Sequence, residues 1–309
     1  MNEILVVLPI FLLIALGLVL KRKKLLSDQT MKEDNFILYW IAMPANLLHG
    51  ILGTDSNSLK DFTFVFATWL PYLIVIILVW LVGRYKETHE RFSVLSLSAV
   101  RGNHFFAGIP VVALAMGQSG VERATLILAF SLVIMQLISI GSGQLAMFGS
   151  LSLKTVKATC AQLLKNPLFV SCFIGLFMVS LDINHLPKWL DATMTILANI
   201  STGLALIVLG AQLHLENIVK MVVSVWKIIF FKLLCMPIVT WIVYVSFGIE
   251  MEYIQAGVLL AAMPVGVNTS IIASEMKMDA EYCARGVAFT TLISILSLPI
   301  WIKVLGIVQ

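Results

Sequence analysis

Long apolar runs alternate with short polar segments along the whole chain. Each run, of up to 27 residues, is close to the ~20 residues with which a helix spans a ~30 Å hydrocarbon core. The runs cover ten ranges: 4–20, 36–52, 62–82, 92–116, 124–148, 163–181, 193–213, 221–247, 253–273 and 282–308. The pattern predicts an all-α integral membrane protein with ten transmembrane helices. A composition of 60% hydrophobic and 12% charged residues agrees, since it is too apolar for an average soluble protein.

Similar residues recur at matching places in the two halves of the chain. Pro9-Ile10-Phe11 with Gly17-Leu18 in the first run is matched by Pro167-Leu168-Phe169 with Gly175-Leu176 in the sixth. The third and eighth runs share a proline, and so do the fourth and ninth: Pro71 and Pro237, Pro110 and Pro264. Proline and glycine are frequent in membrane helices, so their common order, not any one match, favours a repeat.

Each half contains five runs, and this odd number fixes the relation between the halves. The second half is expected to lie upside down in the membrane relative to the first, as in the inverted repeats of many secondary transporters. We therefore expect a first five-helix repeat over residues 1–150 and a second, inverted one over residues 151–309.

Prolines and glycines interrupt the fourth and ninth runs. Proline removes a helical N–H and clashes with the preceding turn, so we expect breaks near Pro110 and Pro264, loosened further by Gly108 and Gly266. Irregular backbone at membrane depth is tolerated only where it is buried in protein or lines a cavity. Two broken helices at matching positions predict the binding site of a transporter.

Both breaks offer hydrogen-bond donors to an anion. Proline is favoured in the first turn of a helix, so a half-helix starts near each break and directs its unpaired N–H groups and positive dipole end there. Asparagine and threonine side chains add further donors. The candidate substrate-binding residues are Asn103, Ile109, Pro110, Pro264, Val265, Gly266, Asn268 and Thr269.

Ionisable residues inside the runs are the candidates for charge and ion coupling. Arg101 and Lys232 lie deep, where a cation needs a partner or an aqueous cavity, and a positive interior favours an anionic substrate. Structural and functional roles are equally open for Lys232. His104 and Glu275 are candidates for carrying protons, whereas Na⁺ would use carbonyl and hydroxyl oxygens at the breaks. Both coupling ions stay open.

For other polar residues in the runs we expect structural roles. Lys227, Arg285 and Lys303 lie near the ends of runs, where long cationic side chains reach the interface. Gln136 is expected to permit close helix packing rather than to bind ligand.

The distribution of Lys and Arg predicts the orientation. Loops after odd-numbered runs carry thirteen of these residues and loops after even-numbered runs carry three. The positive-inside rule then places the odd-numbered loops in the cytoplasm and both termini outside the cell membrane. This bias explains the net charge of +4, so no nucleic-acid partner is indicated. Four scattered cysteines without metal-ligand spacing indicate no metal, disulfide framework or other cofactor.

The residues at the two breaks resemble the crossover motifs of the auxin efflux carrier family, which includes plant PIN-type carriers and bacterial organic-acid permeases. The motifs are Asn103 with Gly108-Ile109-Pro110, then Ala261-Ala262-Met263-Pro264-Val265-Gly266, then Ser274-Glu275. Ser27-Asp28-Gln29, Asn35-Phe36 and Pro44 are similar as well, so the resemblance covers essentially the whole chain.

The resemblance implies a fold and a mechanism. Spans one, two, six and seven form a scaffold, the others form a mobile transport domain, and the protein is a homodimer. Asn103 and the breaks at Pro110 and Pro264 contact a substrate carboxylate. The chain lacks the long central loop of the plant carriers and has Asn268 where they tend to have a second proline. It is therefore more similar to the bacterial members associated with malate or malonate.

The favoured function is a secondary transporter of a small organic anion, not an enzyme, in the lipid bilayer. Alternatives are an uncoupled exporter of auxin-like carboxylates and a non-transporting membrane sensor of the same fold. The chain has no Walker-type loop for ATP hydrolysis, and a cation/proton antiporter should carry acidic residues at its centre. Gly117-Gln118-Ser119-Gly120 resembles the serine motif of rhomboid proteases, but it is expected in a short outer loop without a clearly placed histidine base.

Overall fold

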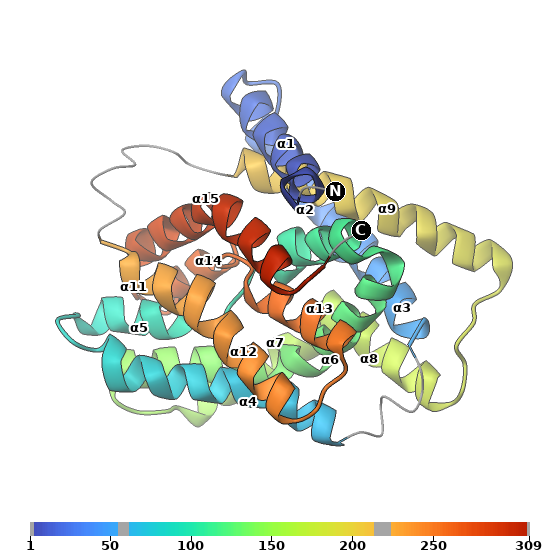
Figure 1. Cartoon of the computed structure of the whole chain (residues 1–309). Coiled ribbons are helices and arrows are strands. Elements are labelled where there is room, and N and C mark those ends of the chain that lie inside the picture. The colour runs from blue at the N-terminus through green and yellow to red at the C-terminus, as the bar shows by residue number, and fades with distance from the viewer. Residues whose placement is uncertain (1–2, 55–61, 213–223, 308–309) are drawn as a thin grey trace.

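The computed structural model describes residues 3–54, 62–212 and 224–307, and this part of the chain is helical except for short connections (Figure 1). Parts of the expected runs at 193–213, 221–247 and 282–308 lie outside it. The elements, with π-helical turns marked η, are α1 Glu3–Arg22, α2 Asp28–Ile37, η1 Leu38–Ala42, α3 Met43–Leu52, α4 Phe62–Leu78, η3 Val79–Gly83, α5 His89–Ser98, η4 His104–Gly108, α6 Ile109–Phe148, α7 Leu153–Lys165, α8 Pro167–Ser180, α9 Lys188–Ala211, α11 Trp226–Ile229, η5 Phe230–Cys235, α12 Met236–Ser246, α13 Met251–Ala261, α14 Thr269–Glu275 and α15 Ala280–Val304.

The chain is a multi-pass membrane protein by the length and apolarity of its helices. Six helical segments of the described chain meet both requirements, and α7 with α8, bent by 68°, adds a seventh if the pair is one crossing. Where the structure describes them, all ten expected runs fall on helices, but the fourth and ninth are each divided and the fourth and fifth meet within α6. The count of ten crossings therefore stays a prediction.

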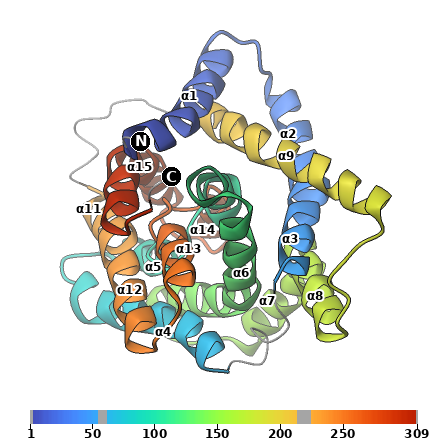
Figure 2. The same ribbon diagram turned by 45° about the vertical axis from the view of Figure 1, so that its right-hand side comes forward.

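The helices pack as two groups. The first group comprises α1, α2 with η1 and α3, α8 and α9, which contact one another closely. The second comprises α4, α5, α6 and α11 to α15. Figure 2 shows the first group along the top and right of the molecule and the second on the left, with α6 facing both. The contacts of α6 and η4 with α3 and α9 join the two groups.

Three prolines follow directly on π-helical turns. Pro44, Pro110 and Pro237 each lie in the first turn of an α-helix, immediately after η1, η4 and η5. The wider π-turn separates the proline ring from the carbonyl that it would meet in a regular α-helix. Proline is thus accommodated without an end to the helix.

This accommodation moves the first interruption away from its predicted position. The stretch around Pro110 is interrupted as expected, but at residues 99–103, about two turns earlier. The second interruption covers residues 262–268 and contains Pro264, which confirms the prediction there. Gly117, with φ of 68°, bends α6 where a short outer loop was expected between the fourth and fifth runs.

Two glycines allow α1 and α9 to touch through their backbones. A Cβ atom on Gly17 would lie 1.9 Å from the carbonyl oxygen of Ile207, and one on Gly210 would lie 1.9 Å from that of Ile14. Small residues at such crossings let membrane helices approach closely and gain van der Waals contact. The first group therefore depends on the absence of side chains at this contact.

We expect Gly210→Ala to lower the free energy of unfolding by about 1–3 kcal/mol, because the added methyl group forces α1 and α9 apart. Thermal unfolding of the purified protein in detergent measures the change. Gly203→Ala is the matched control, since a Cβ there meets nothing within 4 Å. Equal melting temperatures for the two variants would contradict the close contact.

Candidate functional site

The two helix interruptions lie against each other and pair through their backbones. The amide of Asn103 donates to the carbonyl oxygen of Pro264 at 2.7 Å, and the amide of Gly266 donates to that of Arg101 at 3.1 Å. Between these bonds, Gly102 and Val265 form an antiparallel bridge. Because unpaired backbone groups cost several kcal/mol in lipid, each interruption stabilises the other.

Glycine leaves room at this crossing, where residues 99–103 meet residues 262–268. A Cβ on Gly266 would lie 3.3 Å from the carbonyl oxygen of Gly102, and one on Gly102 would lie 2.4 Å from Nε2 of His104. The amide of Val265 donates to the hydroxyl of Thr290 on α15 at 3.1 Å. No sequence pattern indicates Thr290, because its role follows only from the packing of α15 beside the interruption.

A half-helix begins at the crossing on each of the two segments that the bridge between Gly102 and Val265 joins. Asn103 precedes η4 and Asn268 precedes α14, so both positive helix ends lie at the crossing, although the first helix starts at His104 and not near Pro110, where it was predicted. Neither asparagine side chain caps its own helix. The side chain of Asn103 is buried, whereas that of Asn268 is exposed.

Several buried polar atoms at the crossing have no hydrogen-bond partner within the described chain. They are Nε of Arg101, Nδ2 of Asn103, Nδ1 of His104 and Oγ1 of Thr269. Most buried polar atoms in proteins are hydrogen-bonded, because an unpaired one costs ~1–3 kcal/mol. The atoms of Arg101, Asn103 and Thr269 are donors that an anionic ligand can use, whereas the role of Nδ1 of His104 depends on its tautomer.

The guanidinium of Arg101 is buried and is held by α6. It donates to Oε1 of Gln136 and, at 3.1 Å, to the hydroxyl of Ser139. Gln136 therefore also binds a buried charge, a role that the expectation of close helix packing did not include. Among the described residues, no carboxylate lies at ion-pair distance from Arg101.

Lys232 is the second buried cation, and its side chain is fully enclosed with an exposed fraction of 0%. Its ammonium donates to the carbonyl oxygen of Ala261, the last residue of α13, at 2.7 Å. The described ion pairs do not include Lys232 either. Two buried basic side chains thus lie beside the crossing without a carboxylate partner.

Lys227 is held by the polar connection between η3 and α5. Its side chain is buried, and its ammonium donates to the carbonyl oxygens of Gly83 and Tyr85 and pairs with Glu87 at 2.9 Å. The connection between η3 and α5 provides these acceptors, which the sequence could not place beside α11. Its charge is therefore balanced, unlike that of Lys232.

The remaining candidates divide between the crossing and more distant places. Ile109 and Pro110 are buried in the first turn of α6. Ile109 also lines a small cavity between the two helix groups, together with Met43, Asn46, Leu47, Phe105 and Ser201. Glu275 is exposed at the far end of α14, a helix ~10 Å long, so the structure does not bring it to the crossing.

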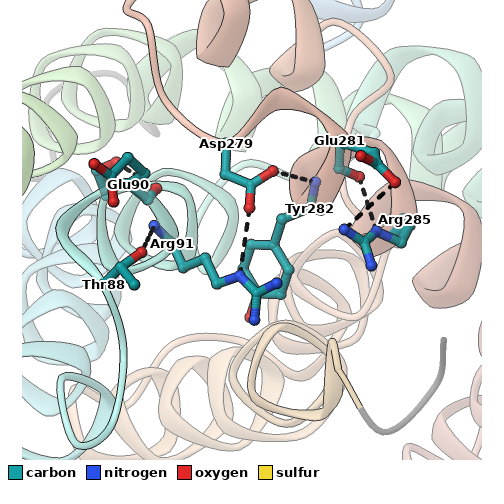
Figure 3. A network of polar contacts seen from close by, with 8 residues as sticks. Thr88, Glu90, Arg91, Asp279, Glu281, Tyr282 and Arg285 are labelled. Carbon is teal, nitrogen blue, oxygen red and sulfur yellow. Dashed lines mark hydrogen bonds and ion pairs between the residues drawn. The ribbon is translucent and has the colours of Figure 1, made fainter.

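Two arginine–carboxylate–tyrosine clusters connect helices of the second group. In the first, Arg91 of α5 pairs with Asp279 at 3.3 Å, where α15 begins, and lies 5.2 Å from the ring centre of Tyr282 (Figure 3). In the second, Arg123 of α6 pairs with Glu252 of α13 and lies 5.5 Å from the ring centre of Tyr253. Each cluster joins helices from before and after residue 150.

We expect Gln136→Leu to destabilise the protein by about 2 kcal/mol or more, because it removes a hydrogen-bond acceptor from the buried guanidinium of Arg101. Thermal unfolding in detergent measures the effect. Gln136→Glu retains an acceptor and is expected to keep most of the stability. A Gln136→Leu variant as stable as the wild type would contradict a role for Gln136 in holding Arg101.

Comparison with known proteins identifies the family of this chain. The model of the family described as "Membrane transport protein" matches residues 4–150 and 150–302. An uncharacterized transporter of Methanocaldococcus jannaschii is 25% identical over 306 residues, which cover 96% of each chain. A protein of Rhizobium meliloti named "Putative malonate transporter" is 22% identical, with 94% of this chain and 91% of the relative covered.

An uncharacterized transporter of Escherichia coli (strain K12) is 24% identical, and the match covers 98% of this chain and 97% of the relative. The match of the family model over both halves, with the paired interruptions and the apolar helices, leads to one assignment. The chain belongs to the membrane transport protein family, the auxin efflux carrier family that its crossover motifs resemble.

Proposed function

We propose that this protein is a secondary transporter that moves a small organic anion across the membrane by alternating access. The observation that carries the proposal is the crossing itself. Two positive helix ends, unpartnered donors of Asn103 and Thr269, and two buried cations without carboxylate partners lie around it. A carboxylate supplies the negative charge and the acceptors that this arrangement lacks.

The substrate carboxylate binds at the helix starts in this proposal. Nδ2 of Asn103 and Oγ1 of Thr269 donate to it, and the half-helices η4 and α14 contribute their amide groups. The exposed side chain of Asn268 offers a contact on the accessible side of the crossing. Pro110, Pro264 and their neighbours shape the site through the backbone.

Small dicarboxylates such as malate and malonate fit this charge. The second carboxylate of such a substrate balances the charge of the second buried cation. The name of the relative from Rhizobium meliloti includes malonate. Coupling to H⁺ or Na⁺ would require that ion to bind among the same helices that bind the anion.

The division of the helices supports the proposed mechanism. We assign the first group, with α1, α2–α3, α8 and α9, as the scaffold and the second as the mobile transport domain. The small cavity at Asn46, Phe105 and Ser201 lies on the boundary between them. The proposal also includes ten membrane crossings arranged as two inverted repeats, residues 1–150 and 151–309. It further includes a homodimer and termini outside the cell membrane.

Uptake into proteoliposomes tests the function directly. We expect the purified protein to accumulate labelled malonate or malate, and imposed pH and Na⁺ gradients identify the coupling. Liposomes with heat-denatured protein provide the background. A correctly folded protein that moves neither acid, nor auxin-like carboxylates, under any gradient would count against transport and favour a sensor.

We expect Asn103→Ala to raise the KM for the anion about tenfold, because a hydrogen bond to a charged group contributes ~1.5–3 kcal/mol. Initial uptake rates at several substrate concentrations measure it. Asn35→Ala is the control, since that amide donates to the backbone of Met31 in α2, away from the crossing. Unchanged kinetics at equal expression would remove Asn103 from the site.

A further inference from the structure

We propose that the ammonium of Lys232 is a tethered cation that occupies a monovalent-cation site at the end of α13. The protein would then carry out its transport cycle without binding Na⁺ at this site. The inference deepens the proposed function, because it assigns a role in ion coupling to a residue beside the crossing. Its binding test, however, requires no knowledge of the substrate.

The position of the ammonium is the first argument. The last carbonyl oxygens of a helix have no intrahelical partner and carry the negative end of its dipole. In α13 these carbonyls lie at the crossing, and the ammonium of Lys232 lies 2.7 Å from the last of them, at Ala261. In secondary transporters with broken helices, Na⁺ is coordinated by such half-helix ends.

The local balance of charge is the second argument. Within the described chain no carboxylate pairs with Lys232. A free cation beside the ammonium would meet uncompensated repulsion, which is strong in a medium of low dielectric constant. The lysine therefore serves in place of an exchangeable ion.

Lys227 provides a contrast on the same stretch of helix. Its ammonium also donates to backbone carbonyls, at Gly83 and Tyr85, but Glu87 balances its charge. The contact between Lys227 and Glu87 is therefore a buried ion pair with a structural role. Lys232 differs because its only described acceptor is the end of a half-helix at the crossing.

The test removes the ammonium and offers free cations in its place. We expect Lys232→Ala to melt at a lower temperature than the wild type in choline chloride and to recover by several degrees in NaCl or methylammonium chloride, because a bound cation stabilises the folded state. The wild type should melt at the same temperature in all three salts. Lys232→Met fills the space without charge and should not recover.

Leu233→Ala is the matched control for the cavity. Leu233 is buried beside Lys232 on η5, so its truncation also removes side-chain volume but vacates no cation. We expect it to melt lower in every salt without recovery. Recovery of Leu233→Ala in NaCl would show a general salt effect and overturn the inference.

Transport provides the second readout. Uptake of labelled malonate or malate by the wild type should be independent of Na⁺, and uptake by Lys232→Ala should rise at least several-fold when Na⁺ replaces choline. Two results would overturn the inference: Na⁺-dependent stability or uptake in the wild type, or a folded Lys232→Ala variant indifferent to both cations. If Lys232→Ala does not fold, the wild type decides the question, because Na⁺-dependent stability or uptake of the wild type would overturn the inference.

Failure of the inference is distinguishable from failure of the proposed function. No flux of any carboxylate by the wild type would count against transport, whatever the salt does to the melting temperature. Normal wild-type flux without cation recovery of Lys232→Ala would count against the tethered cation alone.

Discussion

Backbone polar groups in lipid must find partners, and in this protein two interrupted helices provide them for each other. The bonds from Asn103 to Pro264 and from Gly266 to Arg101 are possible only because the chains cross where both are irregular. The crossing orients everything near it. It places two helix starts together, brings Gly102 and Gly266 into close approach, and leaves the side chains of Asn103 and Thr269 available for other contacts.

The surrounding packing explains how such a crossing is supported. The second helix group encloses it with hydrogen bonds between side chains and backbone, such as the one from the amide of Val265 to the hydroxyl of Thr290. The first group contacts η4 through α9 and α6 through α3. The first group is itself joined by direct backbone contact at Gly17 and Gly210. Internal contacts are thus strong within each group, and η4 and α6 lie at the boundary.

Much of this arrangement follows from residue patterns, because hydrophobic length and the chemistry of proline are local properties. They predicted the helices, the two interruptions and a helix start at each interruption, the second of them near Asn268. They misplaced the first interruption because a π-turn accommodates Pro110. The partners of Arg101, Lys227 and Val265 come from distant segments, so no local pattern reveals them.

The two arginine–carboxylate–tyrosine clusters have a consequence for the history of the chain. Both arginines, Arg91 and Arg123, come from before residue 150, whereas the carboxylates of Asp279 and Glu252 come from after it. If the halves arose by duplication, they have since divided the two signs of charge between them. A protein built from two copies of the first half would have an arginine at each of these contacts but no carboxylate to pair with it. One half therefore no longer substitutes for the other.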